Sequence, residues 1–533
     1  KSVTSIGDHT FEGCSSLTSI EIPSNVESIG DYAFRNCTGL TSITIPKSVT
    51  SIGSNVFDGC TDLTEVLLEG GSAMTSGQLG VDESQIVTYW NEGDLTWTLT
   101  ADGTLTISGS GAMKDYDTDD SPATQKKDNV NKVVIENGIT SIGAYAFYDC
   151  SSLTSIEIPE GVTSIGAFAF YNCGGLTSIE IPETVKNIGN GAFAGCGGLT
   201  SLEIPSGVTS IGDNTFSGCS SLTDITIPDS VTSIGNSAFS GCSSLTDITI
   251  PESVTNIEDS AFEYCSSLTG ITIPESVTSI ERYAFRNCTG LKSITIPKSV
   301  ESVGDKAFSG CTALTEVLLE GGSTLTSESF GEVADKVVTR WNEDSLIWTL
   351  AADGTMTISG TGAMKDYGAD GSPATQKKAN VKKVVIADGV TRIGNRAFSD
   401  CTGLESIEIP SGVTSIGDYA FKSCGSLTSI EIPESVTSIG NGAFQNCSSL
   451  TDITIPSSVT SIGGSAFYNC TDLTSIAIPK SVTSIGENAF SWCSSLASIT
   501  IPKSVASVGD RAFYGCDNLT EVLLENGSTL TSN

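Results

Sequence analysis

Apolar and polar residues follow one short pattern that repeats along most of the chain. Within residues 150–173, Leu153, Ile156 and Ile158 form an LxxIxI pattern, in which the two isoleucines point to one side of a short strand. Pro159 ends this strand because proline has no N–H to donate to a neighbouring strand. We therefore expect one short strand in each repeat, with one buried face and one exposed face.

A second group of apolar residues follows the proline. Val162 and Ile165 predict a second short extended segment, and Gly166 supplies the permissive backbone of a bend. Phe170 and Cys173 then have the close spacing that one turn of helix requires. Each repeat is therefore expected to contain a strand, a bend, a second short strand and one helical turn.

The period of this pattern is 23 residues, and all 17 cysteines mark it. They fall into three groups, within residues 14–60, 150–311 and 401–516, and the spacing inside each group is 23 residues. A fixed period of this size indicates a stack of units, each too small to bury its own apolar face. The sequence therefore predicts a repeat solenoid that is mainly β, in which residues one period apart lie above one another.

The repeat LxxIxIPxxVxxIGxxAFxxC resembles that of the BspA-like class of leucine-rich repeats. It fills three arrays over roughly four fifths of the chain, and a repeat count this high makes the resemblance specific. The resemblance implies a curved leucine-rich-repeat solenoid that is secreted or on a microbial cell surface. Many proteins of this type are adhesins that bind host or matrix proteins or other cells. Fold analogy alone does not establish a partner.

Two β-hairpin modules interrupt the arrays. The second duplicates the first at an offset of 251 residues, which aligns Trp97 with Trp348. Alternating residues on both sides of Asp102 and Gly103 predict a hairpin, and the tryptophans predict a local core. The expected divisions are array 1 at 1–71, a module at 72–131, array 2 at 132–322, a second module at 323–382, and array 3 with the start of a further linker at 383–533.

Both ends of the sequence resemble interrupted elements. The first residues, KSVTSIG, begin inside a repeat, and the last, LTEVLLENGSTLTSN, match the start of a module. No run approaches the ~20 apolar residues of a membrane span, and no signal peptide opens the chain. We therefore expect no membrane insertion in this fragment, and we expect that an export signal or wall anchor could lie in segments cut from both ends.

The charge of the chain narrows the class of partner. Its 62 acidic and 26 basic residues give a net charge of −36. This excess disfavours nucleic acids and anionic membranes, because their phosphates would meet no basic face, whereas a basic protein partner is compatible. Only 38% of the residues are hydrophobic, but they are concentrated at fixed repeat positions, which indicates an ordered chain.

The cysteines raise the question of disulfides and metal. No CxxC motif and no Cys/His pairing occurs, so we predict no metal site and no cofactor. Neighbouring turns would bring Cα atoms within nominal disulfide range, but the side chains would point in parallel and the odd count leaves one unpaired. Free, buried thiols are favoured over disulfides, since an unpaired cysteine often behaves as a small apolar core residue.

We expect no enzymatic activity. The one histidine, His9, lies at a variable position that holds Tyr32, Tyr145 or Asn214 in other repeats, and no third group would orient it as a catalytic base. None of the 62 acidic residues departs from the repeat pattern as a built glycosidase site would.

Residues 115–120 form an acidic run within the first module. Oxygen-bearing side chains at alternate positions resemble a calcium loop. In the duplicate module, however, Gly368 stands where the first module has Asp117. This difference favours an acidic surface turn over a calcium site.

The exposed face of the main strands is the candidate binding surface. In array 2, five consecutive repeats each carry one carboxylate at the two outward positions of the strand, and array 3 repeats the theme. The candidate residues are Ser155, Glu157, Ser178, Glu180, Ser201, Glu203, Asp224, Thr226, Asp247, Thr249, Glu408, Glu431 and Asp452.

Two interpretations of this face stay open. Solenoids commonly bind through such a surface, and a row of carboxylates suits a basic protein or a hydroxyl-rich ligand. Alternatively, the charges keep a solvated sheet soluble and protect it from association. The corresponding functions are an adhesin-like binding protein and a structural spacer that presents a domain missing from this fragment.

Overall fold

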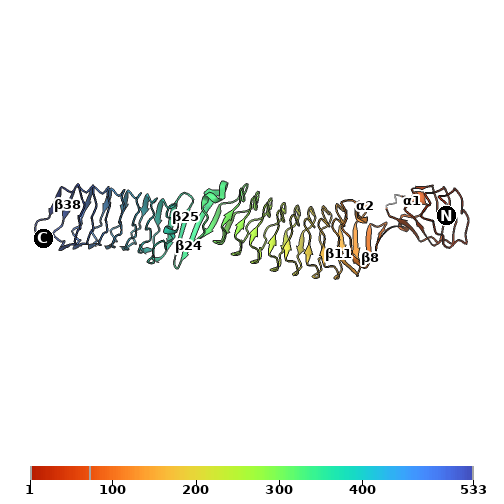
Figure 1. Cartoon of the computed structure of the whole chain (residues 1–533), viewed down its shortest axis with the longest axis horizontal. Coiled ribbons are helices and arrows are strands. Elements are labelled where there is room, and N and C mark those ends of the chain that lie inside the picture. Colours follow the sequence, from red (N-terminus) through yellow and green to blue (C-terminus); the bar gives the residue numbers. More distant parts are fainter. Residues whose placement is uncertain (1–2, 71–73, 531–533) are drawn as a thin grey trace. The chain divides into compact units, whose positions relative to one another are not determined.

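The computed structural model describes residues 3–70 and 74–530, which form two compact units. One unit comprises Lys1–Ile294 and Ser299–Thr315, and the other comprises Thr295–Lys298 and Glu316–Asn533. Within each unit, short strands stack turn upon turn (Figure 1), which confirms the predicted leucine-rich-repeat solenoid. The predicted boundary at residues 71 and 72 lies outside the described residues. The division into arrays and modules stays a prediction.

The elements follow the repeat. Array 1 contains β1 (Ser5–Ile6), β2 (Ser28–Ile29), β3 (Ser42–Ile45), β4 (Ser51–Ile52) and β5 (Glu65–Glu69). The first module contains α1 (Ser76–Leu79), the 3₁₀-helix η1 (Glu83–Gln85), β6 (Ile86–Glu92), β7 (Leu95–Thr100), β8 (Thr104–Gly109), β9 (Gly111–Ala112) and α2 (Pro122–Gln125). Array 2 contains β10 (Lys132–Ile135), β11 (Ile139–Ile142), β12 (Ser155–Glu157), β13 (Ser164–Ile165), β14 (Asn187–Ile188), β15 (Ser201–Glu203), β16 (Ser210–Ile211), β17 (Asp224–Thr226), β18 (Ser233–Ile234), β19 (Asn256–Ile257), β20 (Ser279–Ile280), β21 (Ser293–Ile296), β22 (Ser302–Val303) and β23 (Glu316–Glu320).

The second module and array 3 repeat this order. The module contains η2 (Ser327–Lys336), β24 (Val337–Glu343), β25 (Leu346–Ala351), β26 (Thr355–Gly360), β27 (Gly362–Ala363) and α3 (Pro373–Gln376). Array 3 contains β28 (Lys383–Ile386), β29 (Val390–Arg392), β30 (Ser406–Glu408), β31 (Ser415–Ile416), β32 (Ser429–Glu431), β33 (Ser438–Ile439), β34 (Asp452–Thr454), β35 (Ser461–Ile462), β36 (Ser475–Ala477), β37 (Ser484–Ile485), β38 (Ser498–Ile501), β39 (Ser507–Val508) and β40 (Glu521–Leu524). None of the helices in these described stretches has the length and apolar character needed to cross a bilayer.

One repeat of array 2 illustrates how the sequence forms a turn of the solenoid. In β12, Ile156 is buried while the residues on both sides of it are exposed, as the period-two pattern predicts. After the strand, the N–H of Val162 donates to the carbonyl of Pro159 (3.1 Å) and closes the corner that the proline starts. The chain then enters β13, whose Ile165 is also buried. Both predicted extended segments are present.

The helical turn expected in each repeat takes the form of successive tight turns. The N–H of Tyr171 donates to the carbonyl of Phe168, and that of Cys173 to Phe170, each at 3.2 Å. Phe168 and Asn172 have φ angles of 54° and 58°, in the left-handed region. Left-handed residues break a right-handed helical path, so these bonds close separate turns and no regular helix forms.

The stacking follows the 23-residue period. β13 pairs in parallel with β11 and with β14, so that Ser164 lies between Ser141 and Asn187. The tight turns are joined in the same way, because the N–H of Phe147 donates to the carbonyl of Ala169 in the next turn (2.8 Å). Residues one period apart therefore lie above one another, as predicted.

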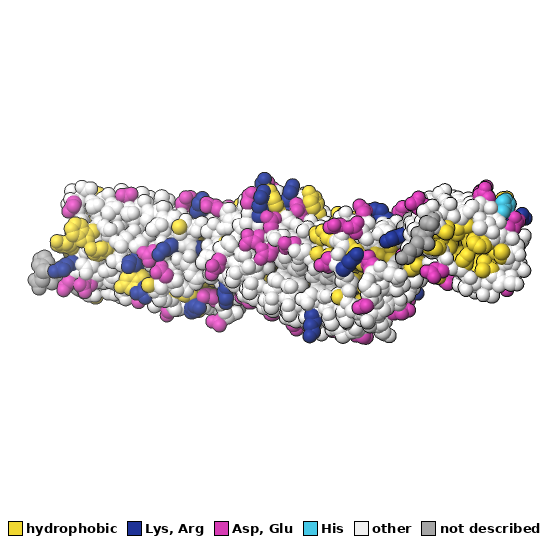
Figure 2. Space-filling model, turned by 45° about the vertical axis from the view of Figure 1, so that its right-hand side comes forward, with side chains coloured by type: hydrophobic (Ala, Val, Ile, Leu, Met, Phe, Trp, Pro, Cys, Tyr) yellow, Lys and Arg dark blue, Asp and Glu magenta, His cyan; other side chains and the backbone are white. Residues whose placement is uncertain are grey.

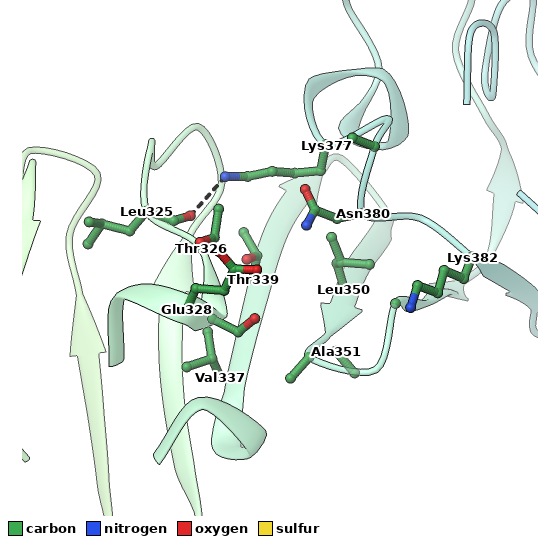
Figure 3. A pocket seen from close by; sticks show the side chains of 14 residues that line it. Leu325, Thr326, Glu328, Val337, Thr339, Leu350, Ala351, Lys377, Asn380 and Lys382 are labelled. Atoms are coloured by element: carbon green, nitrogen blue, oxygen red, sulfur yellow. Dashed lines mark hydrogen bonds between the residues drawn. The ribbon is translucent and has the colours of Figure 1, made fainter. Parts of the chain in front are cut away.

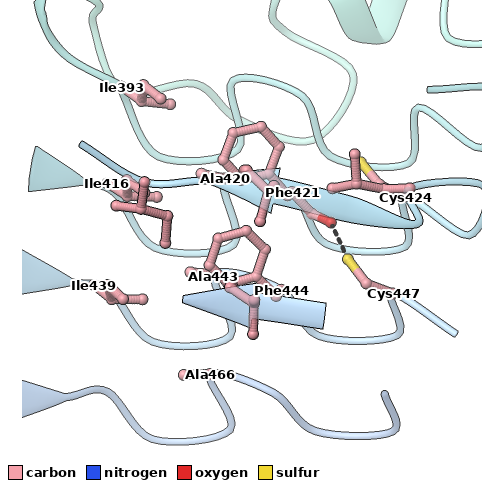
Figure 4. Close-up of a cluster of buried hydrophobic side chains, with 14 of the residues drawn as sticks. Ile393, Ile416, Ala420, Phe421, Cys424, Ile439, Ala443, Phe444, Cys447 and Ala466 are labelled. Atoms are coloured by element: carbon pink, nitrogen blue, oxygen red, sulfur yellow. Dashed lines mark hydrogen bonds between the residues drawn. The ribbon is translucent and has the colours of Figure 1, made fainter. Parts of the chain in front are cut away.

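The interior is a set of columns, each made of one repeat position. Phe421 and Phe444 are fully buried, and their rings stack at 5.4 Å between centroids (Figure 4). Beside them, the Cys447 thiol donates to the carbonyl of Phe421 at 3.1 Å (Figure 4). The same bond joins other turns and satisfies a backbone carbonyl of the preceding turn, which is a requirement for any buried polar group.

The glycine after the second strand lets consecutive turns approach closely. A Cβ added at Gly166 would lie 2.3 Å from the backbone nitrogen of Ala144, one turn earlier. Such a separation is far below a normal contact, so a side chain at Gly166 would require the neighbouring turn to shift. Two other turns have Glu258 and Glu281 at this position. This explains the glycine of the IG dipeptide by proximity and not by an unusual φ angle.

Each module inserts an antiparallel meander into the parallel stack. In the first unit, one sheet has the order β12-β10-β8-β7-β6-β5-β3, and only the pairs β6–β7 and β7–β8 are antiparallel. The hairpin predicted at Asp102 and Gly103 joins β7 to β8. In the second unit, β24–β25 and β25–β26 are the antiparallel pairs. The array strands and the meander therefore share one hydrogen-bonded sheet.

Candidate interaction surface

All of the residues predicted to face outward from the main strands are exposed. In array 2 we call these residues the carboxylate strip, and its members are Ser155, Glu157, Ser178, Glu180, Ser201, Glu203, Asp224, Thr226, Asp247 and Thr249. Glu408, Glu431 and Asp452 are exposed at the same positions in array 3. Each strand places a buried isoleucine or leucine between its two exposed residues, and this alternation directs the polar side chains to solvent.

The strip consists of two parallel rows. β15 pairs in parallel with β17, so that Ser201 lies beside Asp224 and Glu203 lies beside Thr226. Neighbouring strands are about 4.8 Å apart in such a ladder. Residues at the same position of paired strands are therefore neighbours, and Glu180 and Glu203 occupy the same position of successive turns.

The strand geometry is less regular than the sequence pattern. Ser178 and Glu180 lie in a turn whose outer segment forms no described strand. Thr249 takes part in a single bridge, with Thr272. The exposed rows continue through these turns, although the hydrogen-bonded ladder does not.

In arrays 2 and 3, only the first predicted carboxylate is neutralised by a lysine. Lys132, in β10, places its Nζ 2.6 Å from Glu157, and Lys383, in β28, does the same with Glu408. The other predicted strip carboxylates have no ion pair within the described residues. Like charges on neighbouring strands are destabilising, so the strip holds uncompensated repulsion.

Threonines run alongside the strip and stabilise the stack. Thr154, Thr200 and Thr223 each donate a side-chain hydrogen bond to the backbone carbonyl of the turn before.

The face drawn in Figure 2 is mostly uncharged polar side chain and backbone, with acidic and basic side chains scattered over it. A row of unpaired carboxylates is thus a local feature.

The cysteines are free thiols, and most are buried. Burial raises the pKa of Cys196 and of Cys447 to about 12, because the interior disfavours the thiolate. Cys14 is exposed, since it lies in the first turn and has no described turn on its outer side. The buried thiols act as core residues and hydrogen-bond donors, in agreement with the interpretation favoured above.

His9 has partners that account for its place. Its Nδ1 lies 2.6 Å from a carboxylate oxygen of Glu12, and its ring stacks on Tyr32 at 5.3 Å between centroids. The imidazole is exposed at the surface of the first turn. Both contacts of His9 are with neighbouring side chains at the surface. That His9 has no catalytic role stays a prediction.

The acidic run of the first module shows no calcium geometry. Asp115 accepts a hydrogen bond from the backbone N–H of Ala144 (2.8 Å), and Asp366 accepts one from Asn395 in the duplicate. Asp117 is exposed. Throughout residues 3–70 and 74–530, no three His, Cys, Asp or Glu side chains are grouped to hold a metal ion.

A pocket in each module was not foreseen from the sequence. In the second module its volume is about 300 Å³, and its lining includes Lys377, whose Nζ donates to the carbonyls of Ser323 and Leu325 (Figure 3). The first module has a pocket of about 460 Å³ at the matching place, and its lining includes Lys126, which corresponds to Lys377 at the offset of 251 residues. Burial lowers the pKa of Lys377. Because its bonds go to backbone carbonyls, this lysine holds the module's own loop in place.

The repeat sequence matches one protein-family model over most of the chain. The model describes a BspA type leucine rich repeat region, and it matches residues 1–78, 121–245, 209–334, 372–496 and 462–533. The chain belongs to the BspA-type leucine-rich-repeat family.

Several solved structures are similar to this BspA-type chain. A leucine-rich repeat protein from Bacteroides ovatus is 27% identical, with 78% of this chain and 94% of that one covered and a TM-score of 0.37. One from Eubacterium ventriosum is 28% identical, with 68% and 94% covered and a TM-score of 0.34. A leucine rich cell surface protein from Faecalibacterium prausnitzii is 27% identical, with 82% and 95% covered and a TM-score of 0.24. No curated protein matches the BspA-type chain.

Proposed function

We propose that this chain is a non-enzymatic, secreted or cell-surface protein that binds a protein partner through the carboxylate strip. The location and the adhesin-like role rest on the resemblance to BspA-like proteins. The binding surface rests on the strip itself. The partner proposed is a basic protein, such as a host, matrix or cell-surface protein.

The observation that carries this proposal is the run of carboxylates without ion pairs, which is divided between the two rows of the strip. Glu180 and Glu203 occupy the same position of neighbouring turns, and neither has an ion pair within the described residues. Like charges on neighbouring positions of a sheet are destabilising. A partner that supplies Lys or Arg side chains removes this repulsion, so the face is suited to binding.

The charge of the whole chain supports the same class of partner. A net charge of −36 attracts basic proteins from a distance and speeds their encounter. It opposes the approach of nucleic acids, whose phosphates carry the same sign. The position of binding is then set by the strip, because charges that are spread singly over a surface do not define an orientation.

The experiment compares two charge-matched variants of the full chain. The strip variant is Glu180→Gln, Glu203→Gln and Asp224→Asn. The control is Glu160→Gln, Glu252→Gln and Asp229→Asn, which changes three exposed carboxylates outside the strip. Immobilised wild-type chain should retain a saturable partner from extracts of cell-surface and matrix proteins. We expect the strip variant to lose at least about tenfold in affinity, or about 1.4 kcal/mol, and the control to lose less than twofold, about 0.4 kcal/mol.

The alternative function is a spacer that presents another domain. In that case the wild-type chain retains no saturable partner, or both variants retain it equally. If the chain instead binds through the strip, its retention of the partner should weaken as salt rises to about 0.15 M, where the Debye length falls to about 8 Å. Equal loss in both variants would indicate that bulk charge, and not the strip, controls binding.

A further inference from the structure

A cluster of four aromatic rings lies on the surface formed by the tight turns at the start of array 2. We call it the aromatic cluster, and its members are Tyr145, Tyr148, Phe168 and Tyr171, all partly exposed. Tyr148 and Tyr171 stack at 4.8 Å with an interplanar angle of 7°. Tyr145 and Phe168 stack at 5.3 Å and 26°. Contacts at 5.5 Å between Tyr145 and Tyr148, and at 6.0 Å between Phe168 and Tyr171, join the two stacks.

The same repeat position carries a tyrosine in three other turns, and there the ring is covered by a cation. Arg35 lies over Tyr32 at 5.2 Å, Arg282 and Arg286 lie over Tyr283 at 4.2 and 4.9 Å, and Arg396 and Lys422 lie over Tyr419 at 5.3 and 6.0 Å. In each of these turns a basic residue follows the tyrosine by three positions. Such contacts are cation–π interactions, in which the ring face attracts the positive charge.

The aromatic cluster lacks this cover. Three positions after Tyr145 the chain has Tyr148, where the other turns have Arg or Lys. Within the described residues, no Lys or Arg lies over any ring of the cluster. The nearby Lys127 is bonded to Asp149, with Nζ 2.6 Å from Oδ2. The cluster therefore offers ring faces of the kind that elsewhere bind a guanidinium.

The surroundings of the cluster are acidic. Asp149 also accepts a hydrogen bond from Asn172 (2.6 Å), so its carboxylate is held in one position. The hydrogen bond to Asp149 raises the pKa of Lys127, and the charges of Asp119 and Asp128 raise it further. The negative charges that act on Lys127 exceed its own positive charge, and this excess complements a cationic partner.

The backbone at the cluster has the left-handed geometry that this repeat position adopts in the other turns as well. Tyr145 and Phe168 have φ angles of 57° and 54°, a region that bulky side chains rarely occupy. In the turn after Phe168 this position holds Gly191. A Cβ at Gly191 would lie 2.3 Å from the Phe168 ring, so the next turn leaves room for that ring.

We propose that the aromatic cluster is a docking site for arginine side chains of a basic protein segment. The guanidinium is planar and weakly hydrated, so it stacks on exposed rings more readily than an ammonium does. Asp149 would accept hydrogen bonds from the same guanidinium. The cluster and the carboxylate strip belong to different segments of the turn, and the two proposals stand independently.

The test measures binding of short labelled peptides to the full chain by fluorescence polarisation. One peptide alternates arginine and glycine, and the matched peptide has lysine in place of arginine. At about 0.15 M salt, where charges beyond about 8 Å are screened, the arginine peptide should bind several-fold more tightly. The variant Tyr148→Leu with Tyr171→Leu should weaken its binding about tenfold.

A second variant copies the arrangement of the other turns. Tyr148→Arg places a guanidinium three residues after Tyr145, as Arg35 follows Tyr32, and should abolish the arginine preference while the chain stays folded by circular dichroism. Tyr419→Leu is the control and should leave binding unchanged, because cations of the chain already cover that ring. The strip variant Glu180→Gln, Glu203→Gln and Asp224→Asn should keep the arginine preference.

Three results would overturn the proposal. The first is equal affinity for the lysine and arginine peptides, which indicates bulk charge alone. The second is full arginine binding by the Tyr148→Arg variant. The third is binding of a neutral glucan oligosaccharide that the same tyrosine substitutions remove, since this assigns the rings to sugar. Loss of the protein partner by the strip variant alone bears on the carboxylate strip, and the arginine and lysine peptides still decide the aromatic cluster.

Discussion

At the scale of single residues, the repeat places specific side chains where the backbone is left-handed. Asn36, Asn172 and Asn287 have φ angles of 58° to 59° at the position before the cysteine. Asparagine tolerates this conformation better than other non-glycine residues, because its short side chain bonds locally. The sequence alone predicts a helical turn here from the spacing of apolar residues, and it misses the left-handed geometry because spacing carries no information on the sign of φ.

The thiols give the first prediction at this scale. A thiol-reactive disulfide reagent attacks the thiolate, so a buried thiol with a raised pKa reacts slowly at about pH 8. Cys447 is such a thiol, with its pKa raised to about 12 by burial. We expect Cys14, the exposed cysteine, to react quickly, Cys516 to react more slowly, and the rest of the 17 only after denaturation. Absorbance of the released reagent measures each phase.

Its control is Cys14→Ser, which should remove the fast phase and leave the others. A rapid reaction of several thiols in the folded chain would contradict the stacked interior. A loss of reactive thiols after denaturation, relative to the 17 in the sequence, would indicate disulfides.

At the scale of the element, the close approach of successive turns disfavours a side chain at the glycine after the second strand. A Cβ at Gly189 would lie 2.4 Å from the backbone nitrogen of Ala167, whereas one at Gly174 would meet nothing within 4 Å. Gly189→Ala should therefore lower the free energy of unfolding by about 1–3 kcal/mol, since neighbouring turns must separate. Gly174→Ala should change it by less than about 0.5 kcal/mol. Urea unfolding followed by circular dichroism measures both.

The pair is matched, because both variants add one methyl group to array 2. Equal destabilisation by the two would mean that alanine acts through the loss of glycine's flexibility and not through the spacing of the turns. The prediction thus tests the stacking itself.

The strands and their outward faces could be predicted from the sequence for a clear reason. A period of two directs Ile156 inward and Glu157 outward, and the fixed period of the repeat aligns each residue with its counterpart. The ion pair between Lys132 and Glu157 was not predicted. Lys132 lies two positions before Glu157 in register, in a different strand, and a lone lysine carries no periodic signal. The aromatic cluster was not predicted either, because its rings come from only two turns and carry no periodic signal.

At the scale of the whole molecule, each module continues the packing of its array. Trp97 contacts Phe147 at 5.9 Å, and Trp348 contacts Phe398 at 5.7 Å. In both cases a fully buried indole lies against the first phenylalanine of the column that follows. The sequence predicts a local tryptophan core from composition, but the sharing of this core with the array depends on packing that composition does not specify.

The columns of buried thiols should make the chain less stable at alkaline pH. The ordinary thiol pKa is 9.0, and burial raises that of Cys196 and Cys447 to about 12. Between these values the unfolded chain releases protons that the folded chain retains, so the free energy of unfolding falls as pH rises. Below about pH 9 both states are protonated and the thiols have no effect on it. Each thiol that ionises only on unfolding contributes about 1.4 kcal/mol per pH unit.

We therefore expect a steep loss of stability between about pH 9 and pH 12, measured by urea unfolding at a series of pH values. The variant Cys196→Ala with Cys447→Ala starts less stable, because each alanine leaves a small cavity and removes a hydrogen bond to a phenylalanine carbonyl. Its dependence on pH should nevertheless be flatter, by about 1.4 kcal/mol per pH unit for each cysteine removed within a cooperative unit. Cys14→Ala, at the exposed cysteine, should keep the wild-type slope. If the double variant also keeps that slope, the alkaline loss comes from repulsion among the carboxylates, and adding salt should then restore the stability that the thiol mechanism would leave lost.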